Sequence, residues 1–202
     1  FAADVNAVVR EPLGNADYEV GVSEIRRDDD DRGDQAVEQR VRSTRLYEVA
    51  EEMGLTEAKH RVPDAVMRGS EAMARGFLRA LFSADGSVQG TVEKGISVRL
   101  ASSERDLLTD VQRLLLNFGV GSTVYDDRRE AGATELPDGR GGTRAYETKA
   151  QHELVVSSSH LVAFAEEIGF LHDAKNDALA ECLDEYTRGP YRPSFEANVE
   201  SI

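Results

Sequence analysis

Apolar residues between positions 70 and 86 fall on one side of a helical projection and predict an amphipathic helix. Its apolar stripe consists of Met73, Phe77, Leu78, Leu81 and Phe82. Ser70 can cap the beginning of the helix, and Gly86 is suited to a left-handed stop at its end. The pattern therefore places the carboxylate of Asp85 at a helix terminus.

After this helix the apolar residues alternate with polar ones, which is typical of strands with one buried face. Residues 87–92 and 96–101 form a predicted hairpin with apolar and polar side chains on opposite faces. The remaining predicted elements are a helix over 103–119, a hairpin that pairs 122–129 with 144–157 across a loop at 130–143, and helices near 159–168 and 173–186. This α-ββ-α-ββ-α order indicates an α+β fold whose antiparallel sheets pack on helices and expose a polar face.

Residues 41–55 recur in similar form as residues 156–170, at a constant offset of 115 positions (156 − 41). Each copy predicts the end of a strand, a helix capped by serine or threonine, and a glycine stop. A lysine follows each copy, Lys59 after the first and Lys175 after the second. Two copies indicate a pseudo-symmetric protein with two similar halves rather than a solenoid.

The formal net charge of −14 is unfavourable for a protein that binds nucleic acid, because phosphate repels an acidic surface. Arginine nevertheless supplies 20 of the 24 basic residues, against 38 acidic residues. This composition resembles a haloarchaeal-type proteome adapted to high salt, in which surfaces that bind anions also carry acid. The acidic run 28–31 is interpreted as a solvated loop. The charge therefore weakens a nucleic-acid hypothesis without excluding it.

Cys182 is the only cysteine, and the four histidines lack the paired spacings of a zinc site. Any bound metal is therefore expected to be a hard ion with oxygen ligands. No apolar run approaches the length of a membrane-spanning helix, and no signal peptide is recognisable at the beginning of the sequence. We expect a cytoplasmic protein without a membrane partner.

Residues 78–86, with the sequence LRALFSADG, resemble the LAGLIDADG motif of homing endonucleases. Ala80 replaces the usual glycine and Ser83 the first aspartate, whereas Asp85 stands at the metal-binding position. Residues 59–63 resemble the lysine block that precedes the second motif in intein-encoded endonucleases. Residues 195–202 resemble the strand with which an intein's splicing domain resumes.

The resemblance implies the LAGLIDADG homing endonuclease fold, in which two pseudo-symmetric αββαββα halves carry saddle-shaped antiparallel sheets. Residues 1–70 would form the C-terminal part of the first repeat, residues 71–190 the second repeat, and residues 191–202 the start of the returning splicing segment. The sequence would then begin after its first motif. The complete protein would be a monomer with pseudo-twofold symmetry, and the fragment could dimerise through its motif helix.

The resemblance also implies an intein-encoded endonuclease that cuts double-stranded DNA at a specific site with Mg²⁺ as cofactor. The implied catalytic residues are Asp85, which is also the metal ligand, together with Lys59 and Lys175. Polar positions on the outer sheet faces give the predicted DNA-binding residues Gln89, Ser97, Arg99, Arg128, Arg129, Arg144 and Lys149. A chain with one motif is expected to be inactive by itself.

Two other functions remain open at this stage. One is a non-catalytic DNA-binding or passenger module of a protein-splicing element, which the changes at Ala80 and Ser83 and the strong acidity permit. The other is an ordinary small-molecule enzyme, although no glycine-rich phosphate loop, nucleophile triad or metal cluster supports it.

Overall fold

The computed structural model describes residues 6, 10, 14–27, 36–56, 60–91, 95–137, 142–157, 159–171 and 173–184. Its internal contacts divide the chain into two compact units, Phe1–Glu57 and Ala58–Ile202. This division falls before the repeat boundary expected after residue 70. The assignment of residues to two sequence repeats and a splicing segment stays a prediction.

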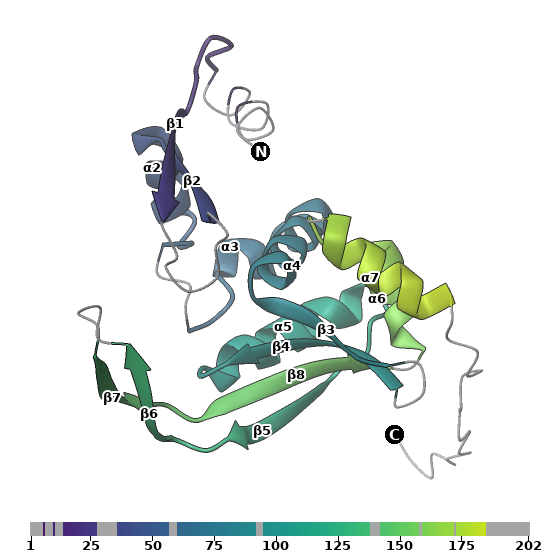
Figure 1. The fold of residues 1–202 in the computed structure, drawn as a ribbon. Coiled ribbons are helices and arrows are strands. Elements are labelled where there is room, and N and C mark those ends of the chain that lie inside the picture. Colours follow the sequence, from purple (N-terminus) through teal and green to yellow (C-terminus); the bar gives the residue numbers. More distant parts are fainter. Residues whose placement is uncertain are drawn as a thin grey trace. The chain divides into compact units, whose positions relative to one another are not determined.

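The first unit contains a hairpin followed by a helix (Figure 1). Strands β1 (Gly21–Arg27) and β2 (Ala36–Arg42) pair antiparallel, and α2 (Thr44–Glu52) follows directly. The hydroxyl of Ser43 accepts the N–H of Leu46 at 2.9 Å and caps this helix. Gly54 has a left-handed backbone, at φ +71°. The strand end, cap and glycine stop predicted for the first repeat copy are therefore confirmed.

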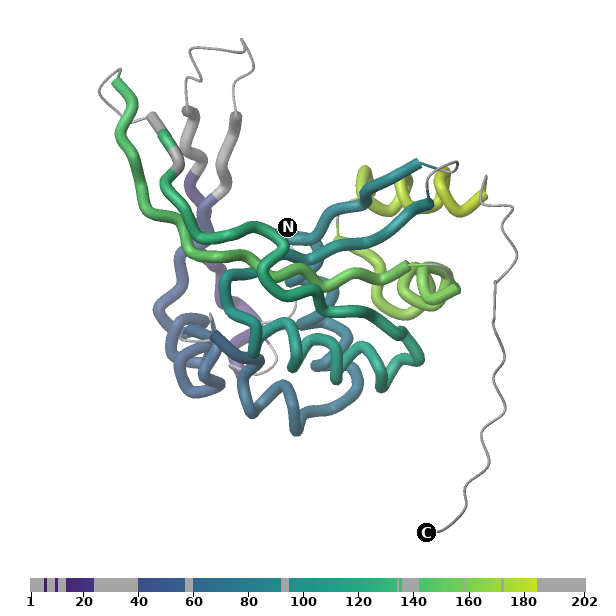
Figure 2. Tube along the Cα trace, turned by 90° about the horizontal axis from the view of Figure 1, so that it is seen from below, coloured from purple at the N-terminus to yellow at the C-terminus, as the bar shows by residue number. Residues whose placement is uncertain are grey.

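In the described part of the second unit, two helices precede a hairpin, a third helix follows it, and four further strands lead to two final helices. Its elements are α3 (Asp64–Met67), α4 (Glu71–Asp85), β3 (Gly86–Thr91), β4 (Gly95–Ser102), α5 (Arg105–Asn117), β5 (Thr123–Arg129), β6 (Gly132–Pro137), β7 (Thr143–Thr148), β8 (Gln151–Ser157), α6 (His160–Glu167) and α7 (Asp173–Asp184). An antiparallel four-stranded sheet has the order β3-β4-β8-β5, and the hairpin β6-β7 extends beyond β5 and β8 (Figure 2).

The core of this unit lies between one face of the sheet and the helices that follow or precede its strands. Apolar side chains that alternate along β4 and β8 are buried against Leu78 and Phe82 of α4 and against the apolar sides of α5 and α6. The sheet residues in this layer are Ile96, Val98, Leu100, Leu154 and Val156. Alternation then turns the polar residues of the same strands toward the other face, on which none of the described helices of this unit lies (Figure 2).

Several local sequence predictions are wrong in the second unit. Residues 130–143, predicted as a loop, contain β6, and the predicted strand 144–157 is divided into β7 and β8. No apolar alternation marked β6, because a two-stranded ribbon has no buried face to require it. Ser159 makes no capping bond to α6, although Gly169 forms the predicted left-handed stop at φ +60°.

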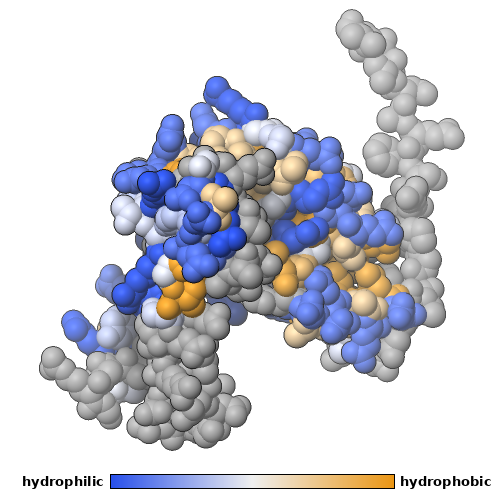
Figure 3. Space-filling view, turned by 90° about the horizontal axis from the view of Figure 1, so that it is seen from above, coloured by the Kyte–Doolittle hydropathy of each residue, from blue (hydrophilic) through white to orange (hydrophobic). Residues whose placement is uncertain are grey.

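In the part of the chain that the structure describes, no helix has the length and apolar character needed to cross a membrane. Polar side chains dominate the surface seen in Figure 3, with apolar residues in patches between them. The exposed apolar residues of the second unit include Leu116, Val162 and Leu171.

Candidate active site and nucleic-acid interface

Asp85 is the last residue of α4, and its side chain is exposed. Gly86 has an extended backbone, at φ −78° and ψ 156°, so the predicted left-handed stop is wrong. A β-carbon on Gly86 would lie 2.5 Å from the carbonyl oxygen of Phe82 and 2.9 Å from its ring atom Cδ1. Glycine is therefore required because the strand leaves the helix directly against its last turn. Over the described residues, no hydrogen bond or ion pair engages the Asp85 carboxylate.

Two side chains hold the backbone on either side of Asp85. The buried hydroxyl of Ser83 accepts the N–H of Leu171 at 2.7 Å. Nζ of Lys175, on α7, donates to the carbonyl oxygens of Ser83 and Gly86 at 2.6 Å and 2.8 Å. An ammonium group at the end of a helix pairs with carbonyls that have no helical partner and offsets the negative end of the helix dipole. The side chain of Lys175 therefore contacts the backbone of the turn that carries Asp85.

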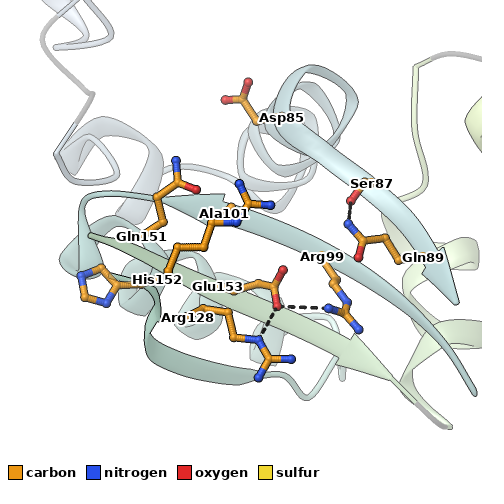
Figure 4. Close-up of a pocket in the computed structure, with 10 residues that line it drawn as sticks. Asp85, Ser87, Gln89, Arg99, Ala101, Arg128, Gln151, His152 and Glu153 are labelled. Carbon is orange, nitrogen blue, oxygen red and sulfur yellow. Dashed lines mark hydrogen bonds and ion pairs between the residues drawn. The ribbon is translucent and has the colours of Figure 1, made fainter. Parts of the chain in front are cut away.

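The polar face of the sheet forms a hollow that Asp85 borders (Figure 4). Four of the predicted DNA-binding residues line it, namely Gln89, Arg99, Arg128 and Arg129. Three residues of β8 that the sequence did not single out also line it, namely Gln151, His152 and Glu153. The structure thus brings the predicted metal ligand and four predicted DNA-binding side chains to one surface.

Glu153 lies between two arginines at the centre of this hollow (Figure 4). Its Oε2 atom is 3.3 Å from Nη1 of Arg99 and 3.5 Å from Nε of Arg128. The Glu153 side chain is only 14% exposed, against 28% for Arg99 and 54% for Arg128. One carboxylate therefore orients two cations across β4, β8 and β5 and leaves this group with one net positive charge.

Ser97 is buried below the same face rather than presented on it. Its hydroxyl accepts the Nε–H of Arg99 at 2.9 Å and contacts the carbonyl oxygen of Gln89 at 3.4 Å. Its position is suited to fixing Arg99, whereas direct contact with a large ligand would require movement of neighbouring side chains.

A β-bulge in β5 sets the direction of Arg128. The pairing with β8 shifts between Tyr125 and Arg129, and Asp127 inside the shift has φ +49°. Nδ1 of His152 accepts the N–H of Asp127 at 3.2 Å and holds the bulge to β8. Bulges increase local twist and redirect side chains, and here the bulge allows Arg128 and Arg129 to line the same hollow.

Asp126 in this bulge is a candidate for acid-sensitive stability. Its hydrogen bond from Nε of Arg105, at 2.6 Å, and the charge of Arg105 hold the pKa of this carboxyl below its usual value, although partial burial opposes the shift. The stabilisation is present above the unfolded pKa of about 3.9 and is lost as the pH falls through the lower folded pKa. We expect Asp126→Asn to destabilise the protein at pH 7 and to have less effect near pH 3, with the difference kept small by the half-exposed position of the pair. Urea unfolding of both proteins across this range measures the difference, and an equal difference at every pH would contradict the assignment.

Arg144 and Lys149 do not line the hollow around Glu153. Arg144 is on the β6-β7 hairpin, with its guanidinium carbon 5.9 Å from the ring centroid of Tyr146. Nζ of Lys149 is 3.2 Å from Oε1 of Glu104, and Nδ1 of His60 is 3.2 Å from Oε2 of the same carboxylate. The hydrogen bonds from His60 and Lys149 lower the pKa of Glu104. Lys59 lies outside the described residues.

The carboxylate of Asp85 is a suitable ligand for a divalent cation. Among the residues that the structure describes, no group of three His, Cys, Asp or Glu side chains could hold a metal ion. The exposed and unpaired carboxylate of Asp85 nevertheless fits Mg²⁺, which uses one or two carboxylates and retains water or phosphate oxygens as its other ligands. A complete site would require oxygen atoms from DNA and from another helix.

Comparison with protein families gives a match for residues 72–169, to the model of the LAGLIDADG-like domain. This stretch begins in α4, contains the whole four-stranded sheet, and ends after α6. Residues 72–169 are therefore similar to the LAGLIDADG-like domain.

Comparison with solved structures confirms the expected fold. Two structures of the homing endonuclease I-DmoI, one of them in complex with DNA and Ca, match with TM-scores of 0.51 and 0.52. Each match covers 89% of this chain and 74% of I-DmoI, at 18% sequence identity. The α+β LAGLIDADG homing endonuclease fold, with its antiparallel sheets, is thus the fold of this protein.

The curated relatives are large enzymes of different kinds. The ribonucleoside-diphosphate reductase NrdEB subunit alpha of Bacillus subtilis (strain 168) is 31% identical over 167 residues, which is 80% of this chain and 15% of that protein. A DNA polymerase of Thermococcus sp. (strain GE8) is 32% identical over 139 residues, which is 67% of this chain and 7% of that protein. The chain spans only these small fractions of the relatives' lengths.

Proposed function

We propose that this chain, whose residues 72–169 match the LAGLIDADG-like domain, is the homing endonuclease domain of an intein and acts in Mg²⁺-dependent, site-specific cleavage of double-stranded DNA. The observation that carries the proposal is the exposed Asp85 at the end of α4, on the border of a hollow lined by Arg99, Arg128 and Arg129. An acid beside a row of guanidinium groups is suited to hold a cation against a phosphodiester.

One side of α4 supports pairing with a second motif helix. Gly76, Ala80 and Ala84 are spaced four residues apart and are all exposed. A β-carbon placed on Gly76 would meet no atom within 4 Å. Small side chains on one stripe allow two helix backbones to approach closely. The partner helix would come from the other repeat of the complete protein, or from a second copy of this chain, and would add the second carboxylate.

Asp85 would hold the metal ion together with that second carboxylate and the phosphate oxygens. When bound, Mg²⁺ stabilises the negative charge that develops on the phosphate and lowers the pKa of an attacking water. Lys175 would support this site by fixing the carbonyls of Ser83 and Gly86, and hence the turn that carries Asp85. Lys59 remains a proposed catalytic cation that acts near the phosphate.

The polar sheet face would lie in the major groove of the DNA. Arg99 and Arg128 are on adjacent parts of this face, and Gln89 adds an amide that can donate to or accept from a base edge. The outer hairpin β6-β7 would extend the contact with Arg144. Local cations on this face offset the repulsion expected from a net charge of −14.

The different kinds of relatives support the proposal that this chain is an inserted element and does not carry the activity of any one of these enzymes. A ribonucleotide reductase subunit and a DNA polymerase perform different reactions, yet this chain matches a small fraction of each, 15% and 7% of their lengths. A mobile segment within unrelated host enzymes explains this pattern, and an intein with an endonuclease domain is such a segment. The activities of the hosts would then not belong to this chain.

A non-catalytic DNA-binding or passenger module is the second candidate. The replacement of the first motif aspartate by Ser83 and the net charge of −14 favour it. In the structure, Ser83 is buried and bonds to backbone, so this position has a structural role that requires no metal.

Cleavage of the host allele that lacks the intein distinguishes the endonuclease from the non-catalytic module. We expect the complete protein, with both motif helices, to linearise a plasmid that carries this allele in the presence of Mg²⁺ and to leave it intact in EDTA. Gel shift of the same DNA measures binding independently of cleavage. Binding without cleavage at any salt concentration would favour the non-catalytic module, and the absence of both would overturn the proposed function.

A further inference from the structure

Three neighbouring groups orient Arg128. Its Nε is 3.5 Å from Oε2 of Glu153, and its guanidinium carbon is 5.4 Å from the ring centroid of Tyr125. The bulge at Asp127, bonded to His152, fixes the backbone directly before it. The side chain is nonetheless 54% exposed. These contacts engage the inner nitrogen and the ring plane, and among the described residues none engages the two terminal amino groups at the open end of the side chain.

Arg99 differs from Arg128 in which of its nitrogens are engaged. Its Nε donates to Ser97, its Nη1 contacts Glu153, and its side chain is 28% exposed. Two of the three guanidinium nitrogens of Arg99 are therefore engaged by neighbouring protein groups. Arg99 balances the charge of Glu153 and stabilises the carboxylate in the position that Arg128 requires.

From this geometry we propose that Arg128 is a specificity-determining residue that reads a guanine in the major groove, and that Glu153 is its positioning residue. The inference rests on the proposed function. Guanine presents two acceptors, O6 and N7, on its major-groove edge, and the two terminal amino groups of an arginine match them. Glu153 reduces the net positive charge beside Arg128 and so weakens the attraction of this arginine to phosphate. The same carboxylate orients the guanidinium plane, and a fixed plane favours binding to two acceptors that lie in one plane, such as those of a base.

Selection from a randomised pool of DNA duplexes tests this inference with the complete protein, which carries both motif helices. The wild-type protein is incubated with the pool in Ca²⁺ at low salt, and bound duplexes are sequenced. We expect a guanine preference at one position of the bound sequences. Glu153→Gln and Arg128→Lys should each reduce this preference about tenfold, because they remove the fixed two-donor edge. Melting temperatures of both variants show whether the fold is retained, and Arg128→Lys changes only a half-exposed side chain.

Glu166→Gln is the matched control. It removes the same charge from an exposed position on α6, which packs on the opposite face of the sheet. Its base preference should equal that of the wild type, so an effect of net charge alone is separated from an effect on orientation.

Three results would overturn the inference while the proposed function stands. They are a bound pool without a guanine preference, a preference that Arg128→Lys leaves unchanged, and a preference that Glu153→Gln leaves unchanged. A uniform loss of affinity for all sequences in Arg128→Lys would assign this arginine to phosphate instead. If the complete wild-type protein selects no duplex at all, the proposed DNA binding itself fails, and the inference fails with it.

Discussion

Asp85→Asn is expected to reduce the rate of Mg²⁺-dependent cleavage by the complete protein by about 10³-fold, with little change in DNA affinity. Asparagine has nearly the same shape as aspartate but lacks the charge that a hard divalent ion requires. The fold should tolerate the change, because the Asp85 side chain is exposed and none of the described side chains bonds to it. A single-turnover cleavage assay and a gel shift on the same duplex measure the two effects separately.

Asp177→Asn is the control for this experiment. Asp177 is an exposed aspartate on α7 and does not border the hollow around Glu153, so the same change of charge there should leave cleavage within twofold of the wild type. Cleavage that survives in Asp85→Asn would remove Asp85 from the mechanism. Cleavage lost together with DNA binding would indicate a structural role instead.

The elements around this acid were predictable because their signals are local. A helical stripe with a serine cap marks α4, and alternation along residues 96–101 marks β4 with its buried and polar faces. Both periodicities come from covalent geometry and from burial of a single face, so they can be read from adjacent residues. The position of Asp85 at the end of the helix follows from the same signals.

The position of Gly86 shows where a local rule is insufficient. Glycine after a helix predicts a left-handed cap, yet Gly86 is extended and is required by its closeness to Phe82. The sequence indicates that position 86 does not accept a side chain. The reason depends on the direction in which the chain leaves the end of α4. Here β3 begins at Gly86 itself, so no residue is available for a separate cap.

The contacts of the charged residues were not predictable from spacing. Glu153 approaches Arg99 and Arg128 because β8 lies between β4 and β5, and this order depends on the topology of the whole sheet. Pairing of β8 with β4 was obscured by the intervening hairpin β6-β7. Lys175 was likewise predicted as catalytic from its place after the repeat, and its bonds to backbone carbonyls of the α4 terminus depend on how α7 packs.

Phe82→Ala is expected to lower the free energy of unfolding by about 3–5 kcal/mol, the largest stability effect of a single substitution that we predict. Phe82 is fully buried, and its ring centroid lies 4.9 Å from that of Phe164 in an edge-to-face arrangement. Phe164 in turn lies 5.5 Å from Phe170. These rings join α4 to α6 and to the segment after it, so truncation would leave a cavity at the centre of the helical layer.

This effect should also reach the candidate site, because the turn at Gly86 rests directly on Phe82. Small domains have a free energy of unfolding of about 5–15 kcal/mol, so this substitution would remove a large part of it. Cleavage should therefore decrease first at elevated temperature. Urea unfolding measures the stability, and cleavage at two temperatures measures the consequence. Leu116→Ala, which truncates a side chain 60% exposed on α5, should change stability by no more than about 0.5 kcal/mol. Equal destabilisation by the two substitutions would show that α4 does not pack on α6 through this aromatic contact.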